Sequence, residues 1–189
     1  MMKDVILASN SPRRRELFDF LGVKYQVITS NIEETIDPGL LPEEQAMELA
    51  FQKAASVFKD HKDKIVMGFD TLVYTETCVF GKPKDQEDAK RMLTILSGNT
   101  HLVVTGVAIL TREVSHSFSS KTAVTFYPLS AAEIEKYVAT GEPMDKAGAY
   151  AVQGYGARFV ERIEGDYFTV MGMPVSRIYQ EFKKLDINL

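Results

Sequence analysis

Hydrophobic residues recur along this chain in two patterns, short apolar runs of strand length and longer stretches with helical spacing. The segments that predict strands are 4–9, 24–30, 64–75, 101–110, 115–129 and 157–163. Helices are predicted over 13–21 and 42–58. Three more are predicted: one that ends at Gly98, one that begins after Ser130 and one that begins after Pro174. The first strand and helix form a strand–loop–helix unit, and the segments 101–110 and 115–129 are expected to pair as antiparallel strands. No internal repeat or low-complexity linker interrupts the pattern, so we expect a single domain over residues 1–189.

The segment "SNSPRRREL" predicts a helix start whose charge opposes the helix dipole. Ser11 is expected to cap the helix with its hydroxyl, and Pro12 suits the first turn. Three arginines follow at 13–15, although the positive end of the dipole favours acidic residues. Either these arginines are solvated, or they bind an anion together with the free N–H groups. Successive helical residues diverge by about 100°, so at most two can face one anion, and Arg13 and Arg14 are nearest the loop.

The helix predicted over 42–58 carries an apolar stripe that a lysine interrupts. Its apolar members are Ala46, Leu49, Ala50, Ala54 and Val57. The position that completes this spacing is Lys53. Its ammonium either reaches solvent beyond the stripe or serves as a functional cation. A methionine at this position would fit the apolar face and leave stability unchanged or slightly raised.

Three carboxylates and a second lysine are further candidates for chemistry. Asp70 follows an apolar run and is expected at the end of its strand, where α/β proteins place their sites. Glu33 and Glu34 lie in a polar loop, and with Asp70 they could supply oxygen ligands to Mg²⁺ or Mn²⁺. Acidic loop residues are also common without any ligand. Lys82 stands before Pro83, which restricts its backbone, although loop lysines are usually solvated.

Composition narrows the function classes. The chain has 189 residues, a net charge of −4 and a pI near 5.5, so no broad nucleic-acid surface is expected and a bound anion would be small. Cys78 is the single cysteine, which excludes an intramolecular disulfide. Signal-peptide and membrane-spanning patterns are absent from the sequence, so a cytoplasmic protein is expected. The three histidines show no metal-ligand spacing and are assigned structural roles.

Five motifs in register resemble the Maf family of nucleotide pyrophosphatases, which was once named for inhibition of septum formation. The matching segments are "SNSPRRREL", "GFDTLV", "GKPKD", "LSGNTHLVVTGVA" and the stretch from "GEPMDKAGAYAVQGYG" through "IEGDYFTVMGMP". Phe18 and Phe69 depart from the leucine and alanine that are commoner in the family. Neither departure touches a charged residue.

The resemblance implies an α/β fold related to that of inosine-triphosphate pyrophosphatases. Such a fold has an elongated, twisted mixed sheet flanked by helices, and two lobes with a central cleft between them. It places substrate phosphates on the loop that contains Ser9, Arg13 and Arg14.

The resemblance also implies the remaining site residues. They are Glu33, Lys53, Asp70, Lys82 and Gln153. Asp70 is implied as the proton acceptor, and Glu33 with Asp70 as ligands of Mg²⁺ or Mn²⁺. Hydrolysis between the α and β phosphates needs an activated water, a metal and cations on the leaving pyrophosphate. Whether Asp70 is base, metal ligand or both stays open at this point.

Within the family, Arg13, Thr71 and Gln153 resemble the branch that acts on dTTP and UTP rather than on 7-methyl-GTP. The amide of Gln153 both donates and accepts, which suits the edge of a pyrimidine. Nucleoside triphosphates, modified pyrimidine nucleotides included, are the expected substrates. The alternative is a regulatory protein of septum formation that senses nucleotides without turnover. The sequence leaves the oligomeric state open, with a homodimer as one option.

Overall fold

The structure, a computed structural model, describes residues 4–187. These residues form two compact units, of which the first comprises 4–70, 105–120 and 172–187 and the second 71–104 and 121–171. The elongated body and the cleft between lobes stay predictions, as does the single domain.

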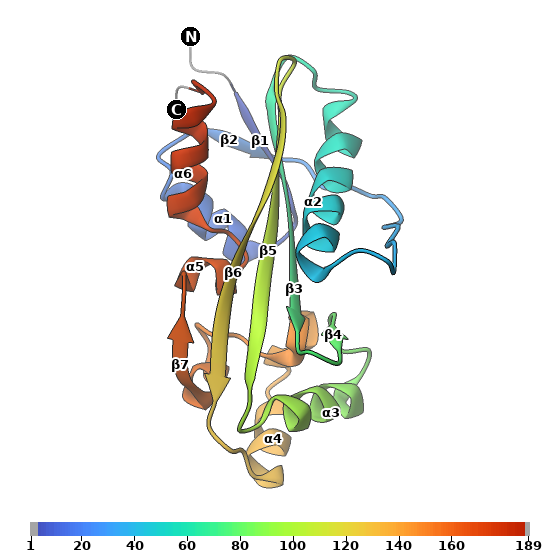
Figure 1. Cartoon of the computed structure of the whole chain (residues 1–189), viewed down its shortest axis with the longest axis vertical. Helices are drawn as coiled ribbons and strands as arrows, with labels where there is room; N and C mark the ends of the chain where they lie inside the picture. The colour runs from blue at the N-terminus through green and yellow to red at the C-terminus, as the bar shows by residue number, and fades with distance from the viewer. Residues whose placement is uncertain (1–3, 188–189) are drawn as a thin grey trace. The chain divides into compact units, whose positions relative to one another are not determined.

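One mixed sheet of seven strands runs in the order β2-β1-β3-β5-β6-β7, and β4 pairs with β3 (Figure 1). The strands are β1 (Val5–Ala8), β2 (Tyr25–Val27), β3 (Ile65–Tyr74), β4 (Val79–Phe80), β5 (Thr100–Leu110), β6 (Ser115–Phe126) and β7 (Val160–Glu164). β1 pairs in parallel with β2 and with β3, whereas β4 and β7 pair antiparallel with their neighbours. The expected α/β class with a mixed sheet is therefore confirmed.

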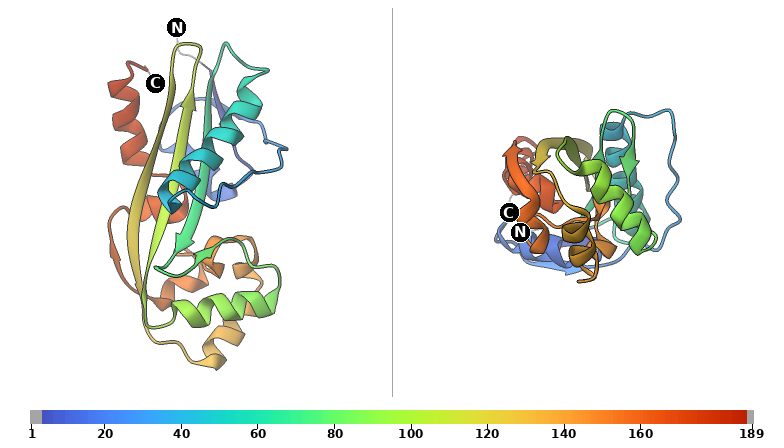
Figure 2. Two further views of the ribbon diagram at one scale, coloured as in Figure 1. Left: turned by 45° about the vertical axis from the view of Figure 1, so that its right-hand side comes forward. Right: turned by 90° about the horizontal axis from the view of Figure 1, so that it is seen from below.

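Three helices belong to the first unit: α1 (Pro12–Asp19), α2 (Pro42–Phe58) and α6 (Val175–Lys184). α2 has the predicted bounds, and its five apolar stripe residues are all buried. It lies directly on the sheet (Figure 2), because Gly68 and Gly106 offer no side chain to hold it away. A Cβ at either glycine would come within 2.1 Å of a carbonyl oxygen, that of Ala50 or that of Ala46. This close approach sets the height of Lys53 above the strands.

The second unit contains α3 (Gln86–Leu96), α4 (Ala131–Val138), α5 (Tyr167–Met171) and three short 3₁₀ helices, η1 (Glu142–Asp145), η2 (Ala147–Ala149) and η3 (Tyr155–Phe159). α3 and α4 lie side by side in Figure 2. Ser130 and Glu133 form the capping box that the sequence predicts for α4. Gly98 and Gly141 end their helices with positive φ, as expected. β4 and α5 are too short for periodicity to reveal.

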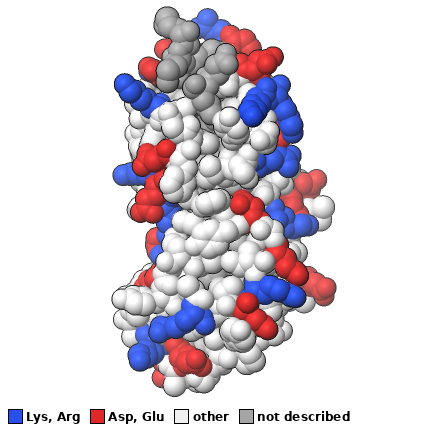
Figure 3. All heavy atoms as spheres, turned by 90° about the vertical axis from the view of Figure 1, so that its left-hand side faces the viewer, with Lys and Arg blue, Asp and Glu red and all other residues white. Residues whose placement is uncertain are grey.

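Charges of both signs are interspersed on the face drawn in Figure 3, and the described residues of that face form no broad basic area. The expectation that nucleic acid is not a partner stays a prediction. None of the helices within residues 4–187 combines the length and apolar character that crossing a bilayer requires.

Candidate active site

The order of the strands in the first unit creates a topological switch point between β1 and β3. The chain leaves β1 through α1 and joins β2 on one side of it, and α2 then leads to β3 on the other side. In α/β sheets, ligands bind at such a switch point, beyond the carboxyl ends of the strands. β1 ends with Ala8 opposite Gly68. Ser9 follows that end of β1, and Asp70 lies two residues farther along β3.

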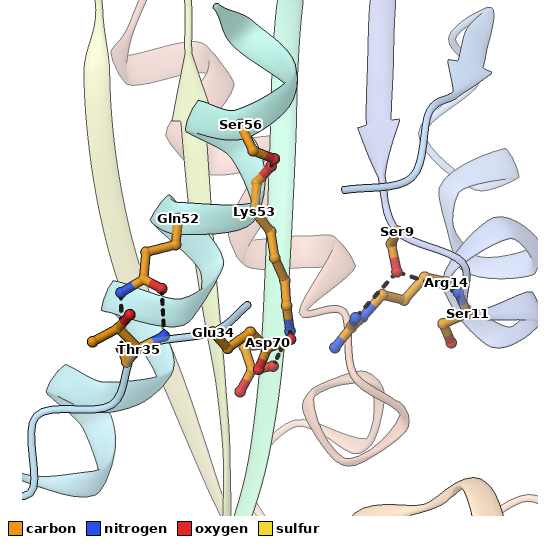
Figure 4. A network of polar contacts seen from close by, with 9 residues as sticks. All are labelled: Ser9, Ser11, Arg14, Glu34, Thr35, Gln52, Lys53, Ser56 and Asp70. Carbon is orange, nitrogen blue, oxygen red and sulfur yellow. Dashed lines mark hydrogen bonds and ion pairs between the residues drawn. The ribbon is translucent and has the colours of Figure 1, made fainter. Parts of the chain in front are cut away.

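Ser9 and Arg14 form the first part of the site (Figure 4). Ser9 is only 7% exposed. Its Oγ accepts hydrogen bonds from the Ser11 N–H at 3.3 Å and from Arg14 Nη1 at 3.2 Å. Arg14 Nε donates to the Gly172 carbonyl at 2.9 Å, and its guanidinium lies 5.6 Å from the Phe69 ring centre. These contacts fix a guanidinium that would otherwise be flexible. Burial lowers the Arg14 pKa to about 10, which leaves it charged at neutral pH.

The capping expected of Ser11 is wrong, because its side chain makes no capping hydrogen bond to α1. The hydroxyl that organises this turn is that of Ser9. The arginine triplet divides as helical geometry requires, since Arg13 and Arg14 are half-buried and Arg15 is exposed. The charge of Arg13 lies close enough to lower the Arg14 pKa further.

Lys53 and Asp70 form the second part of the site. Lys53 Nζ lies 2.5 Å from Asp70 Oδ1 and 3.0 Å from Glu34 Oε1. The side chains of Lys53 and Asp70 are only 16% and 13% exposed. Lys53 therefore turns to a buried carboxylate rather than to solvent. In Figure 4 the Arg14 guanidinium points toward this pair.

Burial raises the pKa of Asp70, because it removes water from the charged form. The positive charges of Lys53 and Arg14 oppose this shift, and the negative charge of Glu34 adds to it. A carboxylate with a raised pKa is a better proton acceptor than an ordinary aspartate.

The expectation that Asp70 ends its strand is wrong. β3 continues to Tyr74, because Thr71–Tyr74 is rich in β-forming residues and β4 pairs with Val73 and Tyr74. The neighbouring β1 ends here instead of β3. Asp70 is thus held in mid-strand, on more rigid backbone than a strand end would offer.

Glu33 and Glu34 lie in the loop before α2, and the structure pairs Glu34 with Lys53. Glu33 is exposed, and its role as a metal ligand stays a prediction. Two carboxylates, those of Glu34 and Asp70, converge on one ammonium, so this spot already holds a cation. Among residues 4–187 no group of three or more His, Cys, Asp and Glu side chains converges. Two carboxylates suit Mg²⁺, which completes its shell with phosphates and water.

Three predicted site residues belong to the second unit. Thr71 follows Asp70 on β3, Lys82 is exposed before α3, and Gln153 is exposed between η2 and η3. The Gly81 carbonyl accepts from the Gly148 N–H at 3.1 Å, which ties the loop of Lys82 to η2. Their joining with the first-unit side chains stays a prediction.

Sequence reasoning missed the partners that hold the charged groups. These are Gly172 and Phe69 at Arg14, together with Gln52 on α2, which binds the backbone of Thr35 next to Glu34. A backbone carbonyl leaves no signal in sequence, and Gln52 is an ordinary polar residue of an amphipathic helix.

Comparison with known proteins shows the family of this chain. A family described as Maf-like protein matches residues 4–185. The dTTP/UTP pyrophosphatase of Bacillus cereus (strain B4264) is 46% identical over 188 residues, which cover 100% of this chain and 98% of that protein. The dTTP/UTP pyrophosphatase of Bacillus cytotoxicus is 48% identical over 185 residues, covering 98% and 97%.

Two solved structures share the fold. The Ham1 protein of Staphylococcus aureus superposes with a TM-score of 0.53 at 15% identity, and the HAM1 protein of Coxiella burnetii with 0.55 at 13%. Each superposition covers 97% of this chain and 100% of the other. At this identity the likeness concerns the fold alone. The family match and the two Bacillus relatives span nearly the whole chain, and the chain therefore belongs to the Maf-like protein family.

Proposed function

We propose that this chain is a pyrophosphatase of dTTP and UTP, which it hydrolyses to the nucleoside monophosphate and pyrophosphate. The observation that carries the proposal is a shielded carboxylate, Asp70, beside two fixed cations, Arg14 and Lys53. The names of the Bacillus relatives point to the same substrates.

In the proposed reaction Asp70 takes a proton from an attacking water. The water oxygen forms a bond to phosphorus, the bridge between the α and β phosphates breaks, and the leaving group departs as pyrophosphate. The raised pKa of Asp70 favours this role, because the acceptor must hold the proton during the step. Arg14 and Lys53 stabilise the negative charge that develops on the phosphate oxygens.

Ser9, Arg13 and the first turn of α1 extend the phosphate site. No Ser11 side chain covers the N–H groups of that turn, which favours an anion at the positive end of the helix dipole. Lys82 is assigned to the phosphates as well, and Thr71 and Gln153 to the pyrimidine. Gln153 can pair with a carbonyl and an N3–H because its amide offers both an acceptor and a donor.

A divalent cation, Mg²⁺ or Mn²⁺, is part of the proposal. Asp70 would hold it together with Glu33 or Glu34, and the substrate phosphates would complete its shell. When bound, it would neutralise phosphate oxygens and polarise the reacting phosphorus. A cation there would have to displace Lys53 from Asp70, and the freed ammonium could then turn to phosphate.

The test is a panel of nucleoside triphosphates assayed for pyrophosphate with Mg²⁺, with Mn²⁺ and with a chelator. We expect dTTP and UTP to be cleaved faster than purine triphosphates, and only with metal. Tight nucleotide binding without pyrophosphate release would show that the protein is a nucleotide sensor and not an enzyme. Turnover that survives chelation would remove the metal from the proposal.

A further inference from the structure

Two consecutive residues of α2 hold two consecutive residues of the acidic loop (Figure 4). Lys53 holds Glu34 at 3.0 Å. Gln52 holds Thr35 by both backbone groups, because its Oε1 accepts from the Thr35 N–H at 3.1 Å and its Nε2 donates to the Thr35 carbonyl at 2.9 Å. The loop is thus fixed to the helix in a defined register.

The Gln52 amide can adopt only one useful orientation. Its Nε2 also donates to Glu48 Oε1 at 3.0 Å, so nitrogen faces two oxygens and oxygen faces an N–H. A flipped amide would lose all three bonds. Residues 33–39 are all exposed, so apolar burial does not hold this part of the loop. The two bonds to Thr35 are therefore a main constraint on where Glu34 lies.

We propose that Gln52 is a positioning residue of the active site, which holds the acidic loop so that the Glu34 carboxylate shares the Lys53 ammonium with Asp70. The inference rests on the proposed function, in which Asp70 accepts the proton. With Glu34 in place, Lys53 is divided between two carboxylates. When the loop is released, Glu34 leaves this position and Lys53 pairs with Asp70 alone.

The first variant is Gln52→Leu, which removes both loop bonds. We expect kcat/KM for dTTP to fall on the order of tenfold, the scale of losing a supporting hydrogen bond behind a site residue. A merely structural residue would lower activity by the same factor with and without the Glu34 carboxylate.

Gln45→Leu is the matched control. Gln45 lies on the same helix, and its Nε2 donates to the Leu40 carbonyl at 2.8 Å, at the far end of the same loop. We expect wild-type kcat/KM for this variant. Equal losses in the two variants would overturn the proposal.

The variant Gln52→Glu keeps the shape of the side chain and tests the hydrogen bond that Nε2 donates to the Thr35 carbonyl. The ionised carboxylate repels the Thr35 carbonyl, whereas the protonated acid again offers one donor and one acceptor. Its activity relative to wild type should therefore rise as pH falls. A ratio that is constant with pH would contradict the proposal.

A double variant tests whether Gln52 affects activity through Glu34. In a Glu34→Gln background, adding Gln52→Leu should change kcat/KM less than about twofold, because neighbours that act through one contact are not additive. Independent, multiplicative losses would show that Gln52 does not act through Glu34.

Hydrogen exchange needs no turnover, so failure of the proposed function can be told from failure of this inference. The Thr35 amide should be protected in wild type and in Gln45→Leu but not in Gln52→Leu. If its protection is unchanged in Gln52→Leu, the inference fails even in an active enzyme. If protection is lost in a protein that cleaves no triphosphate, the loop is positioned as described and the proposed function is what fails.

Discussion

The two units bury polar groups of opposite character. The first unit shields charged side chains, namely Arg14, Lys53 and Asp70. The second shields neutral ones, with His101 1% exposed, Tyr137 0% and Tyr150 5%.

The neutral groups of the second unit are joined by hydrogen bonds and ring contacts. His101 Nε2 and the Tyr150 hydroxyl lie 2.8 Å apart, and the His101 ring meets the Phe126 ring edge-on at 4.9 Å. Burial lowers the His101 pKa to about 4 and raises the pKa of both tyrosines. All three are therefore neutral at pH 7. Within the described chain, His101 Nδ1 is buried with no hydrogen-bond partner, a further reason to avoid charge there.

The loop that carries Gln153 is held by a carboxylate instead. Glu142 accepts from the Tyr155 N–H at 2.9 Å and the Gly156 N–H at 3.1 Å, and the Tyr137 hydroxyl accepts from the Ala151 N–H. A Cβ on Gly154 would lie 1.9 Å from Glu142 Oε1, so a larger residue there would push the carboxylate away from these N–H groups. Gln153 is exposed on a segment fixed at both ends.

This difference distinguishes buried polar groups that serve packing from those that point to chemistry. Neutral hydrogen-bonded groups specify one arrangement of a core at little electrostatic cost. Shielded charges are costly, and a hydrophobic replacement of such a pair is often as stable. Stability alone therefore does not explain the charges of Arg14, Lys53 and Asp70, and they point to function.

The largest expected effect is that of Asp70→Asn. The amide keeps the shape and can still accept from Lys53, but it cannot take a proton. Turnover of dTTP should fall on the order of 100-fold or more with the fold retained. Steady-state kinetics and circular dichroism check this. Asp63→Asn, a change of the same chemistry in the exposed turn before β3, is the control. Near-normal rates for Asp70→Asn would exclude Asp70 as the base.

Lys53→Met should lower dTTP hydrolysis by roughly 100-fold, the scale of losing one placed electrostatic stabiliser. Helical spacing alone predicts unchanged or raised stability, but the ion pair alters that expectation. Asp70 loses its cation while it stays shielded, and a shielded polar group left without its partner should cost roughly 1 to 3 kcal/mol of unfolding free energy at pH 8.

This loss has a defined pH dependence. Without Lys53 the Asp70 pKa in the folded state rises further above its ordinary 3.8, so the folded protein binds the extra proton. Lys53→Met should therefore recover stability relative to wild type as pH falls. The double variant Lys53→Met/Asp70→Asn should be about as stable as wild type at pH 8. A double variant no more stable than Lys53→Met would show that the stem of Lys53, and not its charge, supports the fold.

The second unit should respond to pH in the opposite sense. The His101 pKa falls from 6.5 to about 4 on folding, so the unfolded chain binds more protons between these values and stability decreases as the pH is lowered. The free energy of unfolding of wild type, measured with urea, should decrease by about 2 to 3 kcal/mol from pH 7.5 to 4.5 through this group. His101→Leu should lose that much less. Tyr150→Phe should keep the wild-type slope, since burial rather than the hydrogen bond shifts the pKa. A flat wild-type profile would contradict the assignment.

Local signals were enough for the helices. α2 and α4 could be predicted because proline, capping residues and 3.6-residue spacing act within a few residues of the positions they determine. The same spacing exposed Lys53 as an exception. Ser11 does not cap the helix with its side chain, and its N–H instead donates to the hydroxyl of the neighbouring Ser9.

The fold class, the position of most helices and strands, the family and the candidate site residues could all be predicted from the sequence. Which of these residues meet depends on the tertiary structure. Asp70 meets Lys53, Glu34 joins them, and Arg14 is held by Gly172. Residues 14 and 172 come together because of the order in which strands join the sheet, and that order is a property of the whole chain rather than of any segment. The raised pKa of Asp70 has the same origin, since burial by distant parts of the chain sets it.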